Sequence, residues 1–423
     1  MAKVLFLAAG IYGVVAVSLH PPQFGPPTEM GNLAENLAST GSFSNPFFVL
    51  KTGPTAVTPP LYPFVLSILI RLLHNSNLVY IAAVIGCILA NAFTAVLLPR
   101  ISNLFYGDVI PGIIASVLWI PAMPLIPSYD VSYTIVGLIV FCLVAFRAAA
   151  DQSHGTRFAL VAGVIAAIVL LFNPATLLIL APWMLFLLWR GTAPIGTRVM
   201  SCCIIATLAA LSIGGWGIRN YYRLGGFTVR ATMGMTLYAS NNNCAEVDIF
   251  RDQLYGCYNS HHPNTSLHEA ELLRSLGEIQ YDHRRISDTE TWIRHHLRRF
   301  AVLTFWRTIA FWFPRTLPSA TEILERGGYR IPEQVQGWIT QRDVDAYVIR
   351  FITALSIPGL FIMAWRRMLI TAYILAVSMI YPLMYYIVIA DMRFRYPVLW
   401  LSLLPAGYFA YHLIALRPRP RKN

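Results

Sequence analysis

Long apolar runs separated by short polar segments dominate this chain of 423 residues. Runs of about 15–22 apolar residues are long enough to cross the hydrocarbon core of a bilayer as helices. The pattern predicts about ten spans, near residues 4–19, 78–98, 109–126, 131–147, 158–172, 175–189, 199–215, 346–365, 368–390 and 396–416. No cleavage site of small residues follows the first run, so we interpret 4–19 as a retained helix. We therefore expect an all-α polytopic membrane protein.

Two further runs, 60–73 and 300–314, are apolar but ambiguous. If neither run crosses the membrane, most basic residues of the short loops fall on the same side as both termini, as the positive-inside rule requires. These residues are Lys3, Arg100, Arg147, Arg157, Arg190, Arg198, Arg366, Arg367 and the tail RPRPRK. We therefore expect 60–73 to lie along the interface, 300–314 to be an interfacial or re-entrant helix, and both termini to be cytoplasmic.

The composition agrees with a membrane protein, since 56% of the residues are hydrophobic and 12% are charged, whereas soluble domains carry about 25% charged residues. The net charge of +12 lies largely in short loops and the tail. This is the positive-inside signal and not the footprint of a nucleic-acid-binding protein. We expect membrane lipids as partners and no nucleic acid.

Four polar pieces remain on the outer face: 20–77, the turn around Asp130, 216–345 and the turn Asp391–Pro397. The largest, 216–345, shows helical stretches such as Leu267–Gln280 and Thr289–Arg299 and little β-alternation. No internal repeat or linker divides the chain. We expect a single membrane domain over 1–423, with a first outer loop at 20–77 and an outer-face helical subdomain at 216–345.

Two acids on the outer face are candidates for catalysis. Glu29 opens a short amphipathic helix, and an acid facing a cavity there can take a proton from an attacking hydroxyl. The alternative is an acid stabilised by the helix dipole in a first turn. Asp130 stands at the outer start of a span, where an acid can face an aqueous cavity or cap the helix. The sequence leaves both interpretations open for both residues.

Several basic residues on the same face are candidates for binding phosphate, because arginine forks match phosphate oxygens. They are Lys51, Arg219 with Asn220, Arg223, Arg230, Arg393 and Arg395. The alternative is snorkelling or a salt bridge, for example between Asp391 and Arg393. We expect at least two of Arg219, Arg393 and Arg395 to line one cavity with Glu29.

The cysteines divide by environment. Cys244 and Cys257 lie in the predicted outer loop, and we expect them to form a disulfide worth about 3 kcal/mol in the chain-entropy model. The other four lie in apolar runs and are expected to be packing residues. The polar segments Asn241–Asn243 and His261–Asn264 could meet a sugar or serve as ordinary loop residues. No spacing of Cys, His or acids is diagnostic of zinc, so we assign no metal site and leave a role for a divalent cation open.

Several segments, taken in order, resemble bacterial members of the GT-C glycosyltransferase superfamily. The branch that they resemble is related to dolichyl-phosphate-mannose protein mannosyltransferases and lipid A aminoarabinose transferases. The segments are EMGNLAENLASTGSFSNPF (29–47), GPTAVTPPLYP (53–63), NPATLLILAP (173–182), GWGIRNYYRLGGF (215–227), HHPN through GEIQYDHRR (261–285), FWRTIAFWFP (305–314) and MRFRYP (392–397).

The resemblance implies a GT-C-like fold with juxtamembrane helices between the first two spans. It implies inverting transfer from a polyprenyl-phosphate-linked sugar to a lipid, glycan or protein acceptor. The reaction would occur on the periplasmic or extracellular side of a bacterial inner membrane, with an acid of the first outer loop as base. It carries over Lys51, Arg219, Arg393 and Arg395 as phosphate contacts, and we expect the polyprenyl chain near residues 305–313.

The chain departs from this family at one position. The mannosyltransferases typically carry an acidic pair, beginning with Asp, three or four residues before the position matched to Met30. Here Gly25-Pro26-Pro27 stands in that place, and Glu29 is the first acid. Either Glu29 serves as the base or the base lies elsewhere, with Asp130 next. The alternatives are an inactive relative or a transporter of lipid-linked sugars, although a transporter typically shows an internal repeat or paired broken helices.

Overall fold

Seven helices in the residues described by the computed structural model, 1–21, 28–316 and 333–415, are long and apolar enough to cross a membrane. They are α1 (Ala2–Leu19), α4 (Ser76–Tyr106), α6 (Val131–Ala150), α7 (Gly155–Phe172), α9 (Ile195–Leu224), α17 (Glu333–Trp365), whose apolar part begins at Arg342, and α20 (Tyr396–Ala415). The described residues form helices and no named strand. The all-α membrane fold expected from the sequence is confirmed.

The other three expected spans are present as shorter apolar helices. They are α5 (Ile110–Trp119), which a 3₁₀ turn extends to Ala122; α8 (Leu177–Arg190), after a 3₁₀ turn at Pro174–Thr176; and α18 (Ile370–Ile380), followed by α19 (Leu383–Tyr386). The run expected over 368–390 is divided between α18 and α19 at Tyr381–Pro382. Pro382 has no N–H to donate to the preceding turn, which interrupts the helical hydrogen bonds there.

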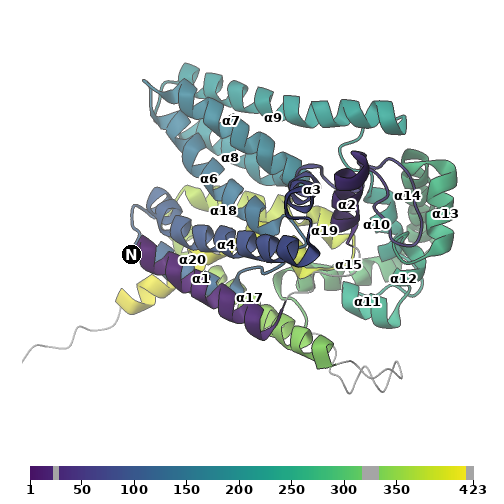
Figure 1. Cartoon of the computed structure of the whole chain (residues 1–423). Helices are drawn as coiled ribbons and strands as arrows, with labels where there is room; N and C mark the ends of the chain where they lie inside the picture. The colour runs from purple at the N-terminus through teal and green to yellow at the C-terminus, as the bar shows by residue number, and fades with distance from the viewer. Residues whose placement is uncertain (22–27, 317–332, 416–423) are drawn as a thin grey trace, which may run out of the picture.

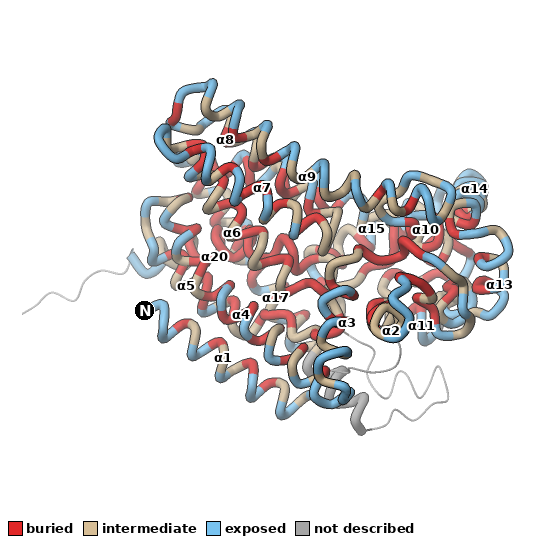
Figure 2. Tube along the Cα trace, turned by 45° about the horizontal axis from the view of Figure 1, so that its top comes forward, coloured by how far each residue is buried: buried red, intermediate tan, exposed pale blue. Residues whose placement is uncertain are grey.

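Close contacts between helices build the membrane part. α1 packs on α4, while α20 packs against both α17 and α5. At the two α20 contacts, an added Cβ on Gly359 or Gly407 would overlap the backbone carbonyl of Pro405 or Pro111. Small residues at such positions let two backbones approach closely, which is how helices commonly associate in lipid. The buried residues run through the middle of this bundle (Figure 2).

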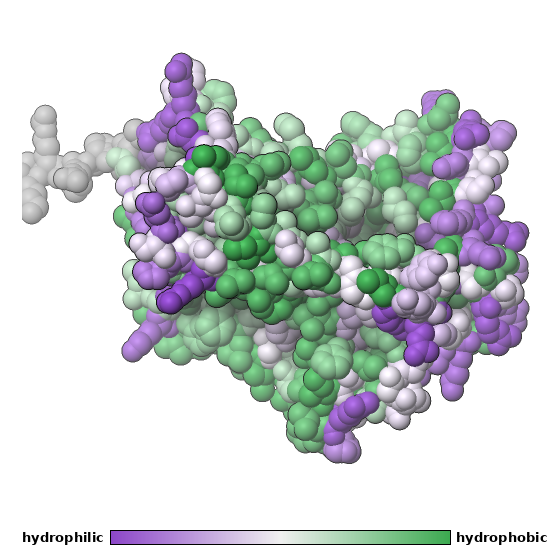
Figure 3. Space-filling view, turned by 90° about the horizontal axis from the view of Figure 1, so that it is seen from above, coloured by the Kyte–Doolittle hydropathy of each residue, from purple (hydrophilic) through white to green (hydrophobic). Residues whose placement is uncertain are grey.

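The surface shows a broad apolar region between two hydrophilic ends (Figure 3). Large apolar side chains are exposed along the membrane helices, including Leu7 and Ile11 of α1 and Leu211 and Ile218 of α9. In water such a surface would be costly, whereas in a bilayer it faces hydrocarbon. The arrangement is that of an integral membrane protein.

The hydrophilic end opposite the N-terminus is a helical unit, residues 225–296, which we call the polar subdomain (Figure 1). It contains α10 (Met233–Ser240), α11 (Ile249–Tyr255), α12 (Tyr258–His261), α13 (Leu267–Leu276) and α14 (Glu278–His295), and α15 (Leu297–Trp312) follows it. The stretches expected over Leu267–Gln280 and Thr289–Arg299 are helical, and each is interrupted once, at Gly277 and at His296. Gly277 has φ +77°, which only glycine adopts readily.

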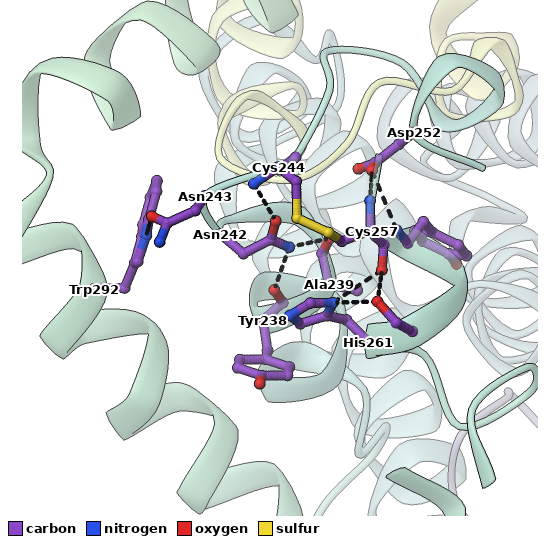
Figure 4. The surroundings of a disulfide bond; sticks show 12 residues. Tyr238, Ala239, Asn242, Asn243, Cys244, Asp252, Cys257, His261 and Trp292 are labelled. Carbon is purple, nitrogen blue, oxygen red and sulfur yellow. Dashed lines mark hydrogen bonds between the residues drawn. A yellow bond between two sulfur atoms is a disulfide. The ribbon is translucent and has the colours of Figure 1, made fainter. Parts of the chain in front are cut away.

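The disulfide between Cys244 and Cys257 has its Cα atoms 5.6 Å apart and closes the loop between α10 and α12 (Figure 4). Asp252 accepts hydrogen bonds from the backbone N–H groups of Cys257 and Tyr258. The indole N–H of Trp292 donates to Asn243 at 2.8 Å and ties α14 to the same loop. These contacts fix the start of α12.

Two helices of the first outer loop stand beside the polar subdomain, α2 (Glu29–Thr40) and α3 (Leu61–Leu73) (Figure 1). Thr28 caps α2 by accepting the N–H of Gly31 at 3.1 Å. The helices expected at Glu29 and after Pro60 are both present. The guanidinium of Arg71 in α3 donates to the carbonyls of Leu37 and Ala38, which holds the two helices together. That α3 lies along the membrane interface stays a prediction.

Candidate functional site

The four polar pieces predicted for the outer face meet around one cavity of about 310 Å³. The start of α2, the turn before α6, the polar subdomain and the turn before α20 each contribute to its wall. Its charged or ionisable lining residues are Glu29, Tyr129, Asp130, Arg230, Tyr258, His262, Tyr381, Tyr385 and Arg393. Neutral polar groups, including Thr58, Asn173 and Asn264, complete a lining suited to a polar ligand.

Glu29 reaches this cavity because Thr28 starts α2 immediately before it. The carboxylate side chain is 21% exposed, and its Oε1 lies 3.6 Å from Nε2 of His262. An acid that is partly exposed to a cavity can receive a proton from a bound ligand.

Asp130 lines the same cavity from the N-cap position of α6 and is buried. Its Oδ2 accepts a hydrogen bond from the hydroxyl of Thr134 at 2.8 Å. Burial raises the pKa of the Asp130 carboxyl, although Thr134 and the cations Arg230 and Arg393 act in the opposite direction. Both sequence candidates for the base therefore face one cavity.

Arg393 is the predicted phosphate contact that the structure places at the cavity. Its guanidinium lies 4.3 Å from the ring centre of Tyr129 and 3.6 Å from Asp391. Burial alone would lower the pKa of Arg393, but Tyr129, Asp391, Glu29 and Tyr258 together raise it. The salt bridge to Asp391 is present, and the Nε of Arg393 is buried without a hydrogen-bond partner among the described residues.

The remaining residues that the family resemblance or the sequence pattern offered for phosphate binding line neither this cavity nor a second cavity beside it. They are Lys51, Arg219, Asn220 and Arg395. Arg219 donates to the carbonyls of Thr55 and Phe43 and lies 4.8 Å from the ring centre of Trp216. Asn220 is buried, donates to the carbonyl of Thr228 and accepts from Arg219. These contacts are structural.

Arg395 and Lys51 also lie elsewhere. Arg395 is buried, with its guanidinium 4.3 Å from the ring centre of Trp312 and a hydrogen bond to Ser402. Lys51 is exposed. The expectation that two of Arg219, Arg393 and Arg395 line the cavity with Glu29 is wrong, because Arg219 is bonded to backbone carbonyls and Arg395 is buried beside Trp312, away from the cavity.

Two further residues complete the charged lining. Arg230 was one of the outer cations considered for phosphate binding, and His262 belongs to the segment His261–Asn264 that could meet a sugar. Arg230 lines the cavity while its Nε donates to the carbonyl of Val57 at 3.0 Å. The sequence signal was only that both residues stand in polar outer segments.

A second cavity of about 370 Å³ adjoins the first and shares Thr28, Tyr129, Ile249, Gln253 and Arg393 with it. Its wall includes Tyr12 and Ala16 of α1 and the charged residues Arg342, Asp345 and Asp391. Neither cavity includes a residue of α15, where the lipid chain was expected. Phe311 of α15 instead stacks behind the lining residue Tyr385.

In the part of the chain that the structure describes, no group of three or more His, Cys, Asp or Glu side chains is placed to hold a metal ion.

Comparisons with known proteins identify the fold. The sequence matches no protein-family model and no curated protein. The structure is similar to a solved archaeal oligosaccharyltransferase, AglB from Archaeoglobus fulgidus, in complex with an inhibitory peptide and a dolichol-phosphate. The similarity has a TM-score of 0.53 at 12% identity and covers 98% of this chain. The chain spans 52% of the length of that neighbour. The comparison shows that this chain shares the fold of that membrane enzyme.

Proposed function

We propose that the protein transfers a sugar from a polyprenyl-phosphate donor to a hydroxyl or amine acceptor, with inversion at the sugar C1. The observation that carries this proposal is the meeting of an acid, Glu29, with two cations, Arg230 and Arg393, in one cavity of a GT-C fold. A base and an anion-binding group are what the reaction needs. The neighbour's complex with a dolichol-phosphate supports a lipid-linked donor.

The reaction is a single displacement. The acceptor loses its proton to the Glu29 carboxylate while its oxygen or nitrogen forms a bond to C1. The bond from C1 to the phosphate oxygen breaks, and the lipid phosphate leaves with the electron pair. Arg393 and Arg230 stabilise the charge that develops on the leaving oxygen. Inversion requires the base and the phosphate to stand on opposite faces of the sugar ring, as in inverting glycosidases.

The two cavities provide places for two substrates. Arg393 lines both, so we place the donor phosphate at their boundary. The second cavity reaches α1, a membrane helix, through Tyr12 and Ala16, and this suits the lipid end of a donor. We further propose that the enzyme belongs to the mannosyltransferase and aminoarabinose transferase branch. Its cavity would then face the outer side of a bacterial inner membrane, with a lipid, glycan or protein as acceptor.

To test this, the protein is reconstituted in nanodiscs. It is then supplied with synthetic polyprenyl-phosphate hexoses and pentoses as donors and with envelope lipids and glycans as acceptors. Transfer is measured as release of polyprenyl phosphate. Glu29→Gln should lower the rate by about 10²–10⁴-fold and leave binding of polyprenyl phosphate intact. Glu35→Gln is the matched control, because Glu35 is in the same helix and exposed, and it should transfer normally.

Asp130→Asn separates the two candidate bases. If that variant loses transfer and Glu29→Gln keeps it, Asp130 is the base and the assignment of Glu29 is wrong. A transporter would instead move labelled donor across sealed vesicles without releasing polyprenyl phosphate, which would overturn the proposed function.

A further inference from the structure

The ring of His262 is held by contacts on several sides. Its buried ring stacks on Tyr258, with ring centres 5.0 Å apart, and meets the edge of Phe47 on another side. The turn that carries it is fixed to the first outer loop, because the N–H of Phe48 donates to Oδ1 of Asn264 at 3.1 Å. The disulfide at Cys257 anchors the preceding residues. The ring therefore has a defined orientation toward the cavity.

The hydrogen bonds of the ring determine where its proton is. The backbone N–H of Asn264 lies 3.1 Å from Nδ1 of His262, and a backbone N–H can only donate. Nδ1 is therefore the acceptor, and in the neutral ring the proton is on Nε2. Nε2 faces Oε1 of Glu29 at 3.6 Å, slightly beyond hydrogen-bond distance. Such contacts commonly tighten when a substrate closes the site.

The surroundings of this histidine favour its neutral form. Burial lowers the pKa of His262 below its ordinary value. Glu29 from α2 and Glu269 from α13 act in the opposite direction, while Arg393 adds to the lowering. A protonated imidazole would form an ion pair with Glu29 and make the carboxylate a poorer base. A neutral N–H donor orients the carboxylate without that penalty.

We propose that His262 is a positioning residue that directs the carboxylate of Glu29 toward the acceptor by donating its Nε2–H to one carboxylate oxygen. The other oxygen is left for the acceptor proton. Because Nδ1 is already occupied by Asn264 and Nε2 carries a proton, His262 does not itself take that proton. This inference rests on the proposed function, in which Glu29 is the base.

The test compares His262→Gln with His262→Met. The two side chains have similar length, but only glutamine retains an N–H donor near the position of Nε2. His262→Met should lower kcat at least tenfold with little change in the KM for polyprenyl-phosphate sugar. Its acid limb in the kcat–pH profile should move to higher pH, because the ionised carboxylate loses a donor. His262→Gln should keep most of the wild-type kcat, and its acid limb should stay close to the wild-type pH. The control is His261→Met, since the neighbouring His261 lines neither cavity and should behave as wild type.

Equal kcat and equal acid limbs in the Gln and Met variants would overturn the inference. If His262→Met fails to bind polyprenyl phosphate, its fold is lost and the inference is judged from His262→Gln alone. A wild-type kcat in His262→Gln supports the inference, and a kcat as low as that of Glu29→Gln overturns it. The proposed function fails separately, when the wild-type protein transfers no sugar or Glu29→Gln transfers it normally.

Discussion

At the scale of single residues, the arginines show that residue type does not decide role. Arg219, Arg393 and Arg395 all stand in outer segments close to aromatic rings. Arg219 donates hydrogen bonds to backbone carbonyls, and Arg395 is buried in the protein interior. Of these three, only Arg393 lines a cavity. A guanidinium can serve a ligand only where the fold places it at a cavity.

We expect Arg393→Gln to weaken binding of polyprenyl phosphate by about 10–100-fold, because a hydrogen bond to a charged group is worth about 1.5–3 kcal/mol. Binding is measured by titrating polyprenyl phosphate into the protein in nanodiscs. Arg223→Gln is the control, since Arg223 is exposed and lines neither cavity. Equal weakening in the two variants would mean that general surface charge, and not the Arg393 contact, attracts the phosphate.

At the scale of elements, the segment 55–58 is held from three directions beside the cavity residues Thr58 and Pro59. Arg219 donates to the carbonyl of Thr55 and Arg230 to that of Val57. Glu278, at the start of α14, accepts hydrogen bonds from the Thr55 hydroxyl and the Ala56 N–H, each at 3.0 Å. α9 and the polar subdomain together fix part of the cavity wall that belongs to the first outer loop.

We expect this clamp to make stability depend on pH. Burial raises the pKa of Glu278 from 4.5 to about 8, so the folded protein holds this proton more tightly than the unfolded chain. Stability should therefore fall as pH rises from about 5 to 8, by a few kcal/mol at most. Glu278→Gln should flatten that part of the profile of melting temperature against pH. Glu271→Gln, at an exposed position of α13, should not. A wild-type melting temperature that rises over this range would contradict the assignment.

At the scale of the whole molecule, the apolar region lies between two hydrophilic ends, with the N-terminus at one and the polar subdomain at the other (Figures 1 and 3). The first outer loop and the polar subdomain meet at the cavity. A hydrophilic site at one end of a membrane bundle lets a lipid-linked substrate present its polar part without moving its chain out of the bilayer. Which side of the membrane this end faces follows from the basic-residue pattern as a prediction.

Cysteine labelling of intact cells tests that orientation. Asn77→Cys, at the exposed start of α4, should react with a membrane-impermeant maleimide from outside. Ser153→Cys, in the exposed turn before α7, should react only after the cells are opened. Both variants are made in a chain without the exposed Cys203. Labelling of Ser153→Cys from outside would reverse the predicted orientation.

The features that depend on neighbouring residues could be predicted from the sequence. In the described residues, the apolar membrane helices, the start of α2 at Glu29 and the helical character of the polar subdomain follow from run length and local pattern. Hydrophobic length and local hydrogen bonds act within a few turns of helix, so they can be read along the chain. The break at Pro382 has the same local origin, although the apolar run concealed it.

Which side chains share the cavity could be known only from the three-dimensional structure. His262 faces Glu29 across more than 200 positions of sequence, and its neighbour His261 instead contacts the carbonyl of Cys257. Likewise Arg230 and Arg393 line the cavity, whereas Arg219 and Arg395 are held by packing contacts. The direction of a loop side chain is set by contacts between distant segments, and no periodic pattern along the chain records those contacts.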